Sequence, residues 1–446
     1  MRLTLGSHDV PGADAALAEQ ARRYPGPGAA WQPVHTVYVP ADRFDAQTVR
    51  AWGEEALDLL ERHLPDGAAL SSVFGPFPAE TPGPPAEAPG TSAGASGTAA
   101  GASGTAAGAA EPSTGASGTS AGASGTAEDV RRRVARKLAR EPVEDLRVDF
   151  EDGYGARTDA EEDGHAVRAA EAIAAMHAGG TLPRRWGLRV KSFADGNPAR
   201  SLRTLDGFLT EIVARAGGLP GGFTVTFPKV LMEDYLGQFA ASLASLEEGL
   251  GLRAGTLRFE MQVEAPQTVL FLARSPDLVA ALDGRLAAAH FGVFDYTAAC
   301  GLPPAEQRLD HPVCDHAREV MRVALAGTGV ELSDGSLAAS PASGSTEDVH
   351  ALWRTHAAMV RHSLRHGFYQ GWDMHPSHLV ARYVTVYGFH LATRDAYAAR
   401  VRAWEERRDA GGGVMDEPAT VKTLAAALRR AGLALEDAAG PARTDR

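Results

Sequence analysis

Cysteine is almost absent from this chain. Only Cys300 and Cys314 occur among 446 residues, and they form no C-x-x-C pair. So small a number excludes a disulfide framework and a cysteine-rich zinc site. It also suits a reducing compartment, and we expect the protein to be cytoplasmic.

Long apolar runs and an excess of positive charge are missing as well. No uncharged apolar stretch reaches the roughly 18 residues that a membrane span needs, and the N-terminus has no apolar core long enough for a signal peptide. The formal net charge is −12, which disfavours binding to nucleic acids and anionic membranes. We therefore expect small-molecule partners, and neither a nucleic acid nor a membrane.

One segment, residues 79–127, differs in composition from the rest of the chain. It is rich in Pro, Gly, Ala, Ser and Thr, and the unit GASGT recurs in one seven-residue register, at Gly94, Gly101, Gly115 and Gly122. Two glycines in each unit and the lack of leucine exclude a coiled coil. The segment has too little apolar surface to offset its ordering entropy, so we predict a disordered insertion.

A basic stretch, residues 131–140, follows this insertion. Glu128 and Asp129 precede it and Pro142 follows it, which is the pattern of acidic start and proline stop that marks a helix. We expect a solvated helix here, with a nucleic-acid-binding arm as the alternative.

The remainder of the chain alternates short apolar runs with helical stretches. Eight runs end in polar or turn residues, at Pro40, Glu151, Arg189, Lys229, Glu264, Asp295, Glu331 and Asp373. From the second run onward the ends lie 31 to 42 residues apart, which fits one strand, one helix and two loops.

This repetition predicts an α/β fold, a (β/α)₈ TIM barrel, over residues 34–390. Residues 1–33 would form an N-terminal extension, and residues 391–446 a C-terminal helical segment and tail. In such a barrel the catalytic groups lie at the carboxyl ends of the strands, where the polar run ends fall.

Glu264 and Asp295 are the candidate metal ligands. Each follows an apolar strand, so both carboxylates are expected at the same end of neighbouring strands. Two carboxylate ligands, completed by water and a substrate oxygen, suit Mg²⁺. The alternative is a pair of helix-capping or ion-paired carboxylates.

Arg189 and Lys229 are the candidate cations of the same rim. Arg189 lies inside the strand LRVKSF, where a buried guanidinium needs an anionic partner. That partner could be Glu151 or Asp152, or it could be a substrate carboxylate or a developing enolate. Lys229 has the same two interpretations, and a rim charge or ion pair is favoured over a Schiff base.

The acidic stretch VDFEDGYG contributes Asp149, Glu151 and Asp152. On a strand Asp149 and Glu151 would share one face, and Asp152 would point the other way. One face would look into the barrel mouth towards Arg189 and the ion, while Gly153 permits a tight turn. The alternative is a solvated acidic turn.

The last run ends in DMHPSH, which contains Asp373, His375 and His378. A further ligand at transition-metal spacing is not evident. We expect His375, before Pro376, to shape the final loop and donate a hydrogen bond into the pocket.

Six segments together resemble the HpcH/HpaI aldolase and citrate lyase β-subunit superfamily, barrel relatives of malate synthase. They are VYVPADRF, VDFEDGYG, LRVKSF, MQVEAPQTVL, FGVFDYTAACG and GFYQGWDMHPSHL, in the family's order. The resemblance implies substrate contacts by Arg189 and Glu264, and Mg²⁺ binding by Glu264 and Asp295. It implies carbon–carbon chemistry next to a carbonyl, with an enolate of pyruvate or of an acyl-coenzyme A.

Three positions near the expected pocket depart from the family's pattern, namely Lys191, Ala265-Pro266 and Trp372. These departures leave the substrate open between a free acid and a coenzyme A thioester. The C-terminal helices would either pack beneath the barrel or extend over the mouth of a neighbouring subunit, as in that family. The second arrangement implies a homo-oligomer.

The expected function is a Mg²⁺-dependent carbon–carbon lyase or aldolase, acting on a β-hydroxy acid or its acyl-coenzyme A thioester through an enolate. Arg189 would offset the enolate charge, and Glu151 or Asp152 would position a metal-bound water or relay a proton. Glu264 and His375 complete the expected substrate contacts. The alternatives are an enzyme that condenses an acyl-coenzyme A with a 2-oxoacid, and a barrel that binds a metabolite without catalysis.

Overall fold

The computed structural model describes residues 10–26, 31–77, 120–406 and 416–436. Its centre is a sheet of eight parallel strands in the order β7-β6-β5-β4-β3-β2-β1-β8. Ser333 and Gln370 form a parallel bridge that joins the two outer strands and closes the ring. The predicted (β/α)₈ barrel is confirmed, and each strand overlaps one of the eight predicted runs. The strands are β1 (His35–Pro40), β2 (Asp145–Asp149), β3 (Arg185–Arg189), β4 (Val225–Phe227), β5 (Phe259–Val263), β6 (Leu286–Phe291), β7 (Glu331–Ser333) and β8 (Gly371–Asp373).

Residues alternate along each strand between the barrel interior and the helices outside. On β2, Arg147 reaches across the interior to Glu260 of β5, with 2.6 Å between guanidinium and carboxylate. Its neighbours Leu146 and Val148 therefore face outward, and both are completely buried. The interior is thus polar at this level, while the outer strand faces form the apolar core with the helices.

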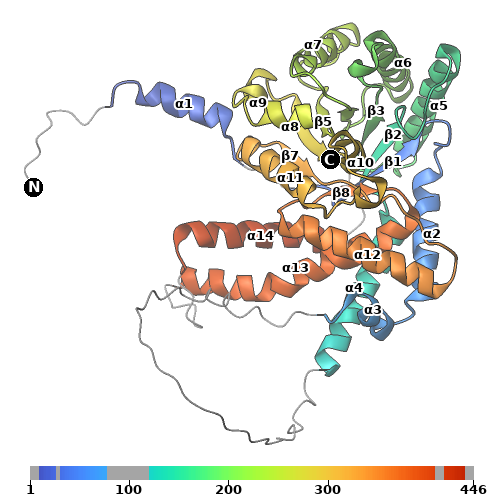
Figure 1. The fold of residues 1–446 in the computed structure, drawn as a ribbon, viewed down its shortest axis with the longest axis vertical. Helices are drawn as coiled ribbons and strands as arrows, with labels where there is room; N and C mark the ends of the chain where they lie inside the picture. The colour runs from blue at the N-terminus through green and yellow to red at the C-terminus, as the bar shows by residue number, and fades with distance from the viewer. Residues whose placement is uncertain (1–9, 27–30, 78–119, 407–415, 437–446) are drawn as a thin grey trace, which may run out of the picture.

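Helices surround the barrel, and the last helices of the chain project from it (Figure 1). They are α1 (Ala13–Arg23), α2 (Thr48–His63), α3 (Gly67–Phe74), α4 (Ser120–Arg140), α5 (Asp159–Ala178), α6 (Pro198–Ala216), α7 (Asp234–Gly249), α8 (Pro266–Leu272), α9 (Leu278–Ala281), α10 (Val293–Ala299), α11 (Pro312–Ala324), α12 (Thr346–Arg365), α13 (Pro376–Glu405) and α14 (Pro418–Glu436), with 3₁₀ turns at Phe193–Asp195 and Pro304–Glu306.

The predicted insertion falls largely on residues 78–119, which lie outside the described part of the chain. Its predicted end at residue 127 is too late, because α4 begins at Ser120. The reason is helix propagation: each residue added to an existing helix gains one backbone hydrogen bond. The predicted helix over 131–140 is confirmed as the second half of α4, with Val134 and Leu138 buried.

The C-terminal helices form a hairpin that projects from the barrel, with α13 and α14 side by side (Figure 1). Helix α13 begins directly after β8 and runs through residue 390 without a break, so the predicted boundary falls inside it. Leu424 and Leu435 of α14 are buried.

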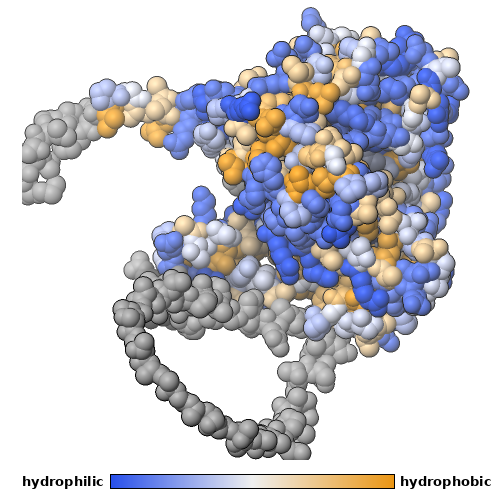
Figure 2. Space-filling model, viewed as in Figure 1, coloured by the Kyte–Doolittle hydropathy of each residue, from blue (hydrophilic) through white to orange (hydrophobic). Residues whose placement is uncertain are grey.

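The visible face of the molecule is mostly hydrophilic, and hydrophobic surface gathers in the region of α8, α9 and α10 (Figure 2). Within the described ranges, none of the helices has the length and apolarity that a membrane crossing requires.

Candidate active site

Charged side chains from five consecutive strands meet at the carboxyl end of the barrel. We call this set the rim cluster. Its members follow or end β2 to β6, and they are Asp149, Glu151, Asp152, Arg189, Lys229, Glu264 and Asp295. The structure therefore brings together the predicted catalytic and metal-binding residues of this rim, with Asp149 and Lys229, which the sequence also placed there.

Arg189 is held in place by Asp149, which ends the neighbouring strand. Its Nε and Nη2 each donate to one carboxylate oxygen of Asp149 at 2.7 Å. The same carboxylate accepts from the backbone N–H groups of Glu151 and Gly153, at 2.9 and 3.0 Å. Burial by itself lowers the pKa of Arg189, but the charge and hydrogen bonds of Asp149, together with the charge of Glu151, outweigh burial and raise the pKa well above its ordinary value. The guanidinium is thus a fixed, permanent cation, with Nη1 3.1 Å from Glu151.

Lys229 is the centre of the cluster. Its ammonium contacts the Glu151 carboxylate, lies 2.5 Å from Asp152 Oδ1 and lies 3.6 Å from Asp295 Oδ2. Its backbone N–H donates to Glu264 at 2.6 Å, and the residue has φ +48°, which is uncommon outside glycine. Burial opposes the charge of Lys229, but the charges and hydrogen bonds of Glu151 and Asp152 together outweigh burial and raise the pKa of Lys229. The amine is therefore held as a cation, which disfavours the Schiff-base interpretation.

Glu264 is buried beneath Asp295, with its side chain against the backbone of Gly292. A Cβ added at Gly292 would lie 2.5 Å from Cβ and 2.6 Å from Oε2 of Glu264, so only glycine permits this approach. Burial raises the pKa of Glu264 to about 8, and the charges of Glu151 and Asp295 act in the same direction. Asp295 lies in the first turn of α10, and 44% of its side chain is exposed.

Negative charge exceeds positive charge in the rim cluster. Five carboxylates face two cations, and one of the cations, Arg189, is bound bidentately by Asp149. Burial raises the pKa of Glu151 to about 7, even against Arg189 and Lys229. Hard oxygen donors with uncompensated charge are what Mg²⁺ binds, so the residues present fit such an ion.

One prediction about this region is wrong in its geometry. Asp152 was expected to point away from Glu151, but both side chains bind Lys229. The reason is that β2 ends at Asp149, so the alternation of a strand does not extend to the two acids.

His375 lies apart from the contacts of the rim cluster. It is the N-cap residue of α13, and its Nδ1 accepts from the backbone N–H of Ser377. Its predicted part in shaping the final loop agrees with this cap. Its predicted hydrogen bond into the pocket is not among its described contacts, which join Nδ1 to Ser377. A substrate contact from His375 stays a prediction.

A residue that the sequence analysis did not single out is Gln262, two positions before Glu264 on β5. It is completely buried, and its amide has no hydrogen-bond partner among the described residues. Strand alternation places it on the inner face between Glu260 and Glu264. Buried amides almost always have partners, so this one is available to a water or a substrate group.

A cavity of about 890 Å³ lies at the opposite end of the barrel. It is lined by residues of α2 and α4 and by the loops that precede β2 and β3, including Arg50, Glu141 and Arg184. No member of the rim cluster lines it, so it is separate from the candidate active site.

Comparison with known proteins gives a family and distant structural likenesses. A family model described as a domain of unknown function (DUF6986) matches residues 13–436, and no curated protein matches the chain significantly. Malate synthase of Haloferax volcanii is similar in its lead(II) complex, at 14% identity and a TM-score of 0.45 over 71% of this chain and 86% of that chain. Its magnesium/glyoxylate complex gives 15% identity and a TM-score of 0.41 over 68% and 93%. Likenesses this distant say nothing about the reaction of this chain.

Proposed function

This chain belongs to the DUF6986 family, and we propose that it is a Mg²⁺-dependent carbon–carbon lyase or aldolase that works through an enolate. The observation that carries the proposal is the rim cluster: buried Glu264 and half-exposed Asp295 at the carboxyl ends of neighbouring strands, beside an immobilised Arg189. In this fold the carboxyl ends of the strands are where active sites lie.

Glu264 and Asp295 are the residues that would hold the ion. When bound, Mg²⁺ would polarise a carbonyl oxygen and offset negative charge that develops on it. Because Asp295 is the more exposed of the two, it forms the open side of the site, towards solvent and substrate.

Arg189 would stabilise the enolate. Nε and Nη2 are committed to Asp149, so Nη1, beside Glu151, is the donor that remains for a substrate oxygen. A cation fixed before the reaction stabilises a developing oxyanion without reorganising during the reaction.

Glu151 would carry the proton. A carboxyl group with a pKa of about 7 is populated in both protonation states near neutral pH, which suits a general acid or base. Asp152 shares Lys229 with Glu151 and would keep that lysine in position.

We propose a β-hydroxy acid or its acyl-coenzyme A thioester as the substrate class, with the amide of Gln262 available to one of its oxygens. Cytoplasmic location and assembly into a homo-oligomer stay predictions. Sedimentation or light scattering of the purified chain would test the second.

The test is Mg²⁺ binding and turnover in Asp295→Ala and Glu264→Ala. Calorimetry should give one Mg²⁺ per wild-type chain, and loss of a ligand should weaken binding by at least about 10- to 100-fold. Cleavage of hydroxy acids and hydroxyacyl thioesters should require Mg²⁺, and its rate should fall in the variants that bind Mg²⁺ more weakly. Asp195→Ala is the control, because Asp195 is an exposed carboxylate after β3 on the same rim.

Unchanged Mg²⁺ binding in Asp295→Ala would remove the proposed site. Consumption of an acyl-coenzyme A only in the presence of glyoxylate would identify the condensing reaction instead of cleavage. Retained Mg²⁺ binding without turnover of any substrate in the panel would favour a metabolite-binding barrel.

A further inference from the structure

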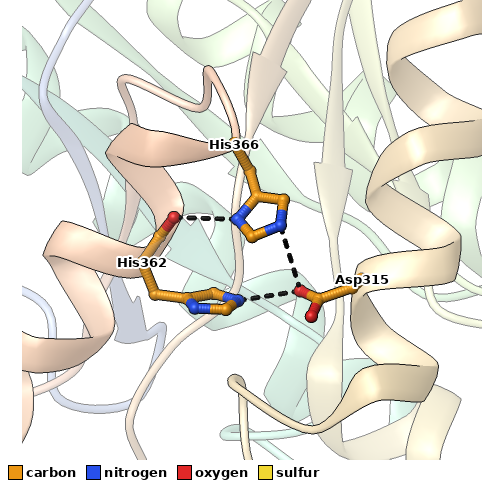
Figure 3. A group of neighbouring side chains, drawn as sticks. All are labelled: Asp315, His362 and His366. Carbon is orange, nitrogen blue, oxygen red and sulfur yellow. Dashed lines mark hydrogen bonds and ion pairs between the residues drawn. The ribbon is translucent and has the colours of Figure 1, made fainter. Parts of the chain in front are cut away.

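A second group of ligand-bearing side chains lies on the helices outside the barrel. Asp315 of α11 faces His362 and His366 at the end of α12, and the three side chains point towards one another (Figure 3). Their possible ligand atoms all lie within 4.8 Å of one another. None of the three belongs to the rim cluster.

The two histidines lie four residues apart on one helix, so they share a face. Nε2 of His362 is 2.8 Å from Asp315 Oδ1, and Nε2 of His366 is 3.6 Å from the same oxygen. The side chains are about one quarter to one third exposed, so an ion can reach them from solution.

The hydrogen bonding of His366 directs its second ring nitrogen at Asp315. Its Nδ1 lies 3.0 Å from the backbone carbonyl of His362, which can only accept, so Nδ1 carries the proton. In the neutral ring Nε2 then presents a lone pair to Asp315 Oδ1, which is also an acceptor. The Nε2 lone pair of His366 is therefore available to an ion that binds beside the Asp315 carboxylate.

The hydrogen bond from His366 Nδ1 to a backbone carbonyl is also typical of a metal-binding histidine. Such histidines almost always donate their second ring N–H to a carbonyl or a carboxylate, which fixes the orientation of the ring. His366 already has this outer hydrogen bond.

Other charges border the group. Arg318 Nη1 donates to Asp315 Oδ1 at 2.6 Å and orients the carboxylate, which leaves Oδ2 for an ion. Arg322 donates to the backbone carbonyl of His366 at 2.9 Å, so it faces the backbone and not the ring nitrogens.

A second group, His356, Asp373 and His378, has similar spacing, but the atoms of Asp373 and His378 that face an ion position already have partners, and only Nδ1 of His356 has none among the described residues. Arg382, His35 and His356 occupy the Asp373 carboxylate. His378 donates from Nε2 to Ala339 and accepts at Nδ1 from Met374. This group is therefore a set of internal ion pairs and hydrogen bonds.

We propose that Asp315, His362 and His366 bind a transition-metal ion of the Zn²⁺ type, with water as the fourth ligand. Two imidazoles and one carboxylate select such ions over Mg²⁺, which prefers oxygen ligands. The ion joins α11 to α12 and stabilises the helical layer, independently of the chemistry at the rim cluster. On binding, His362 presents the Nε2 lone pair and its proton moves to Nδ1.

The experiment is a calorimetric Zn²⁺ titration of the full chain in excess Mg²⁺, which keeps the rim carboxylates occupied. We expect one Zn²⁺ per chain, at least about tenfold weaker binding in His362→Ala or His366→Ala, and none in the double variant. The matched control is His316→Ala, an exposed histidine beside Asp315, which should bind as the wild type does.

Two further measurements separate this site from the rim cluster and from misfolding. The double variant Glu264→Ala/Asp295→Ala should keep Zn²⁺ binding, and the His362→Ala/His366→Ala variant should keep Mg²⁺ binding. Zn²⁺ should raise the Tm of the wild type and of His316→Ala, but not of the double histidine variant.

Equal Zn²⁺ affinity in the wild type and the double histidine variant would overturn the proposal. So would the absence of Zn²⁺ binding to the wild-type chain.

Discussion

At the scale of single residues, the candidate active site depends on close approaches that only particular side chains allow. Gly292 gives Glu264 the room to lie against the chain between β6 and α10, and Gly153 gives the same room to Asp149, whose Oδ2 would be 2.8 Å from an added Cβ. Both carboxylates are positioned by a glycine on a neighbouring segment. The effect of removing one glycine can therefore be measured at the metal site.

We predict that Gly292→Ala weakens Mg²⁺ binding at least about tenfold, because the new methyl group displaces the Glu264 carboxylate. The measurement is calorimetry, with circular dichroism to confirm that the variant is folded. Gly207→Ala is the control: its added Cβ meets nothing within 4 Å, and within α6 alanine should stabilise by about 0.5–1 kcal/mol. Wild-type Mg²⁺ affinity in Gly292→Ala would contradict the assigned role of Glu264.

Buried histidines make the stability of the protein depend on pH, and His378 is one of them. Burial lowers the pKa of His378 to about 3, with a smaller effect from His356. An unfolded histidine takes up its proton near pH 6.5. Between these values the unfolded state binds more protons than the folded state, so the free energy of unfolding falls as the pH falls from about 6.5 towards 3.

We predict that His378→Gln flattens this dependence by up to about 1.4 kcal/mol per pH unit, the value for one proton. Urea denaturation at several pH values from 4 to 7 would measure it, with exposed His316→Gln as the control. An identical slope in wild type and His378→Gln would show that the histidine is not held neutral.

At the scale of elements, helix starts are determined by short local patterns. Thr158 and Glu161 form a reciprocal capping box at α5: the Glu161 N–H donates to the Thr158 hydroxyl, and the Thr158 N–H donates to the Glu161 carboxylate. This helix follows the acidic turn directly, so its start also fixes the end of the turn that carries Glu151 and Asp152.

We predict that Thr158→Ala lowers the free energy of unfolding by about 0.5–2 kcal/mol, while Thr158→Ser, which keeps the hydroxyl, changes it by much less. Urea denaturation of the three proteins is the measurement. Equal losses in the two variants would mean that the methyl group, and not the cap, stabilises this region.

At the scale of the whole molecule, Asp373 fastens the closure of the barrel. It comes from β8 and binds Arg382 of α13 at 2.8 Å, His35 of β1 at 3.1 Å and His356 of α12 at 3.1 Å. Burial alone would raise the pKa of Asp373, but these three partners lower it well below its ordinary value. The last strand, the first strand and two helices therefore depend on one buried carboxylate.

We predict that Asp373→Ala destabilises the protein by about 3–5 kcal/mol, because it leaves the buried Arg382 without its counter-charge. Denaturant unfolding would measure the loss. The control, Asp395→Ala, removes a carboxylate that is 91% exposed and should change stability by less than about 0.5 kcal/mol. A loss as small as that of the control would contradict the role of Asp373 in closure.

The sequence by itself determined the barrel and the composition of its rim. Strand and helix periods are local properties, and a parallel barrel places every strand's carboxyl end on one side, so Arg189, Glu264 and Asp295 could be assigned to one rim in advance. The start of α4 was missed because an alanine- and glycine-rich segment predicts no helix until a packed helix extends into it.

Only the tertiary structure decided which charged side chains contact one another. Asp149 at the end of β2 binds Arg189 at the end of the neighbouring strand β3. Lys229, whose own φ is +48°, contacts three carboxylates from other segments. Asp315 meets two histidines from a different helix. Such pairings depend on the paths of separate segments through space, whereas composition and periodicity describe each segment alone.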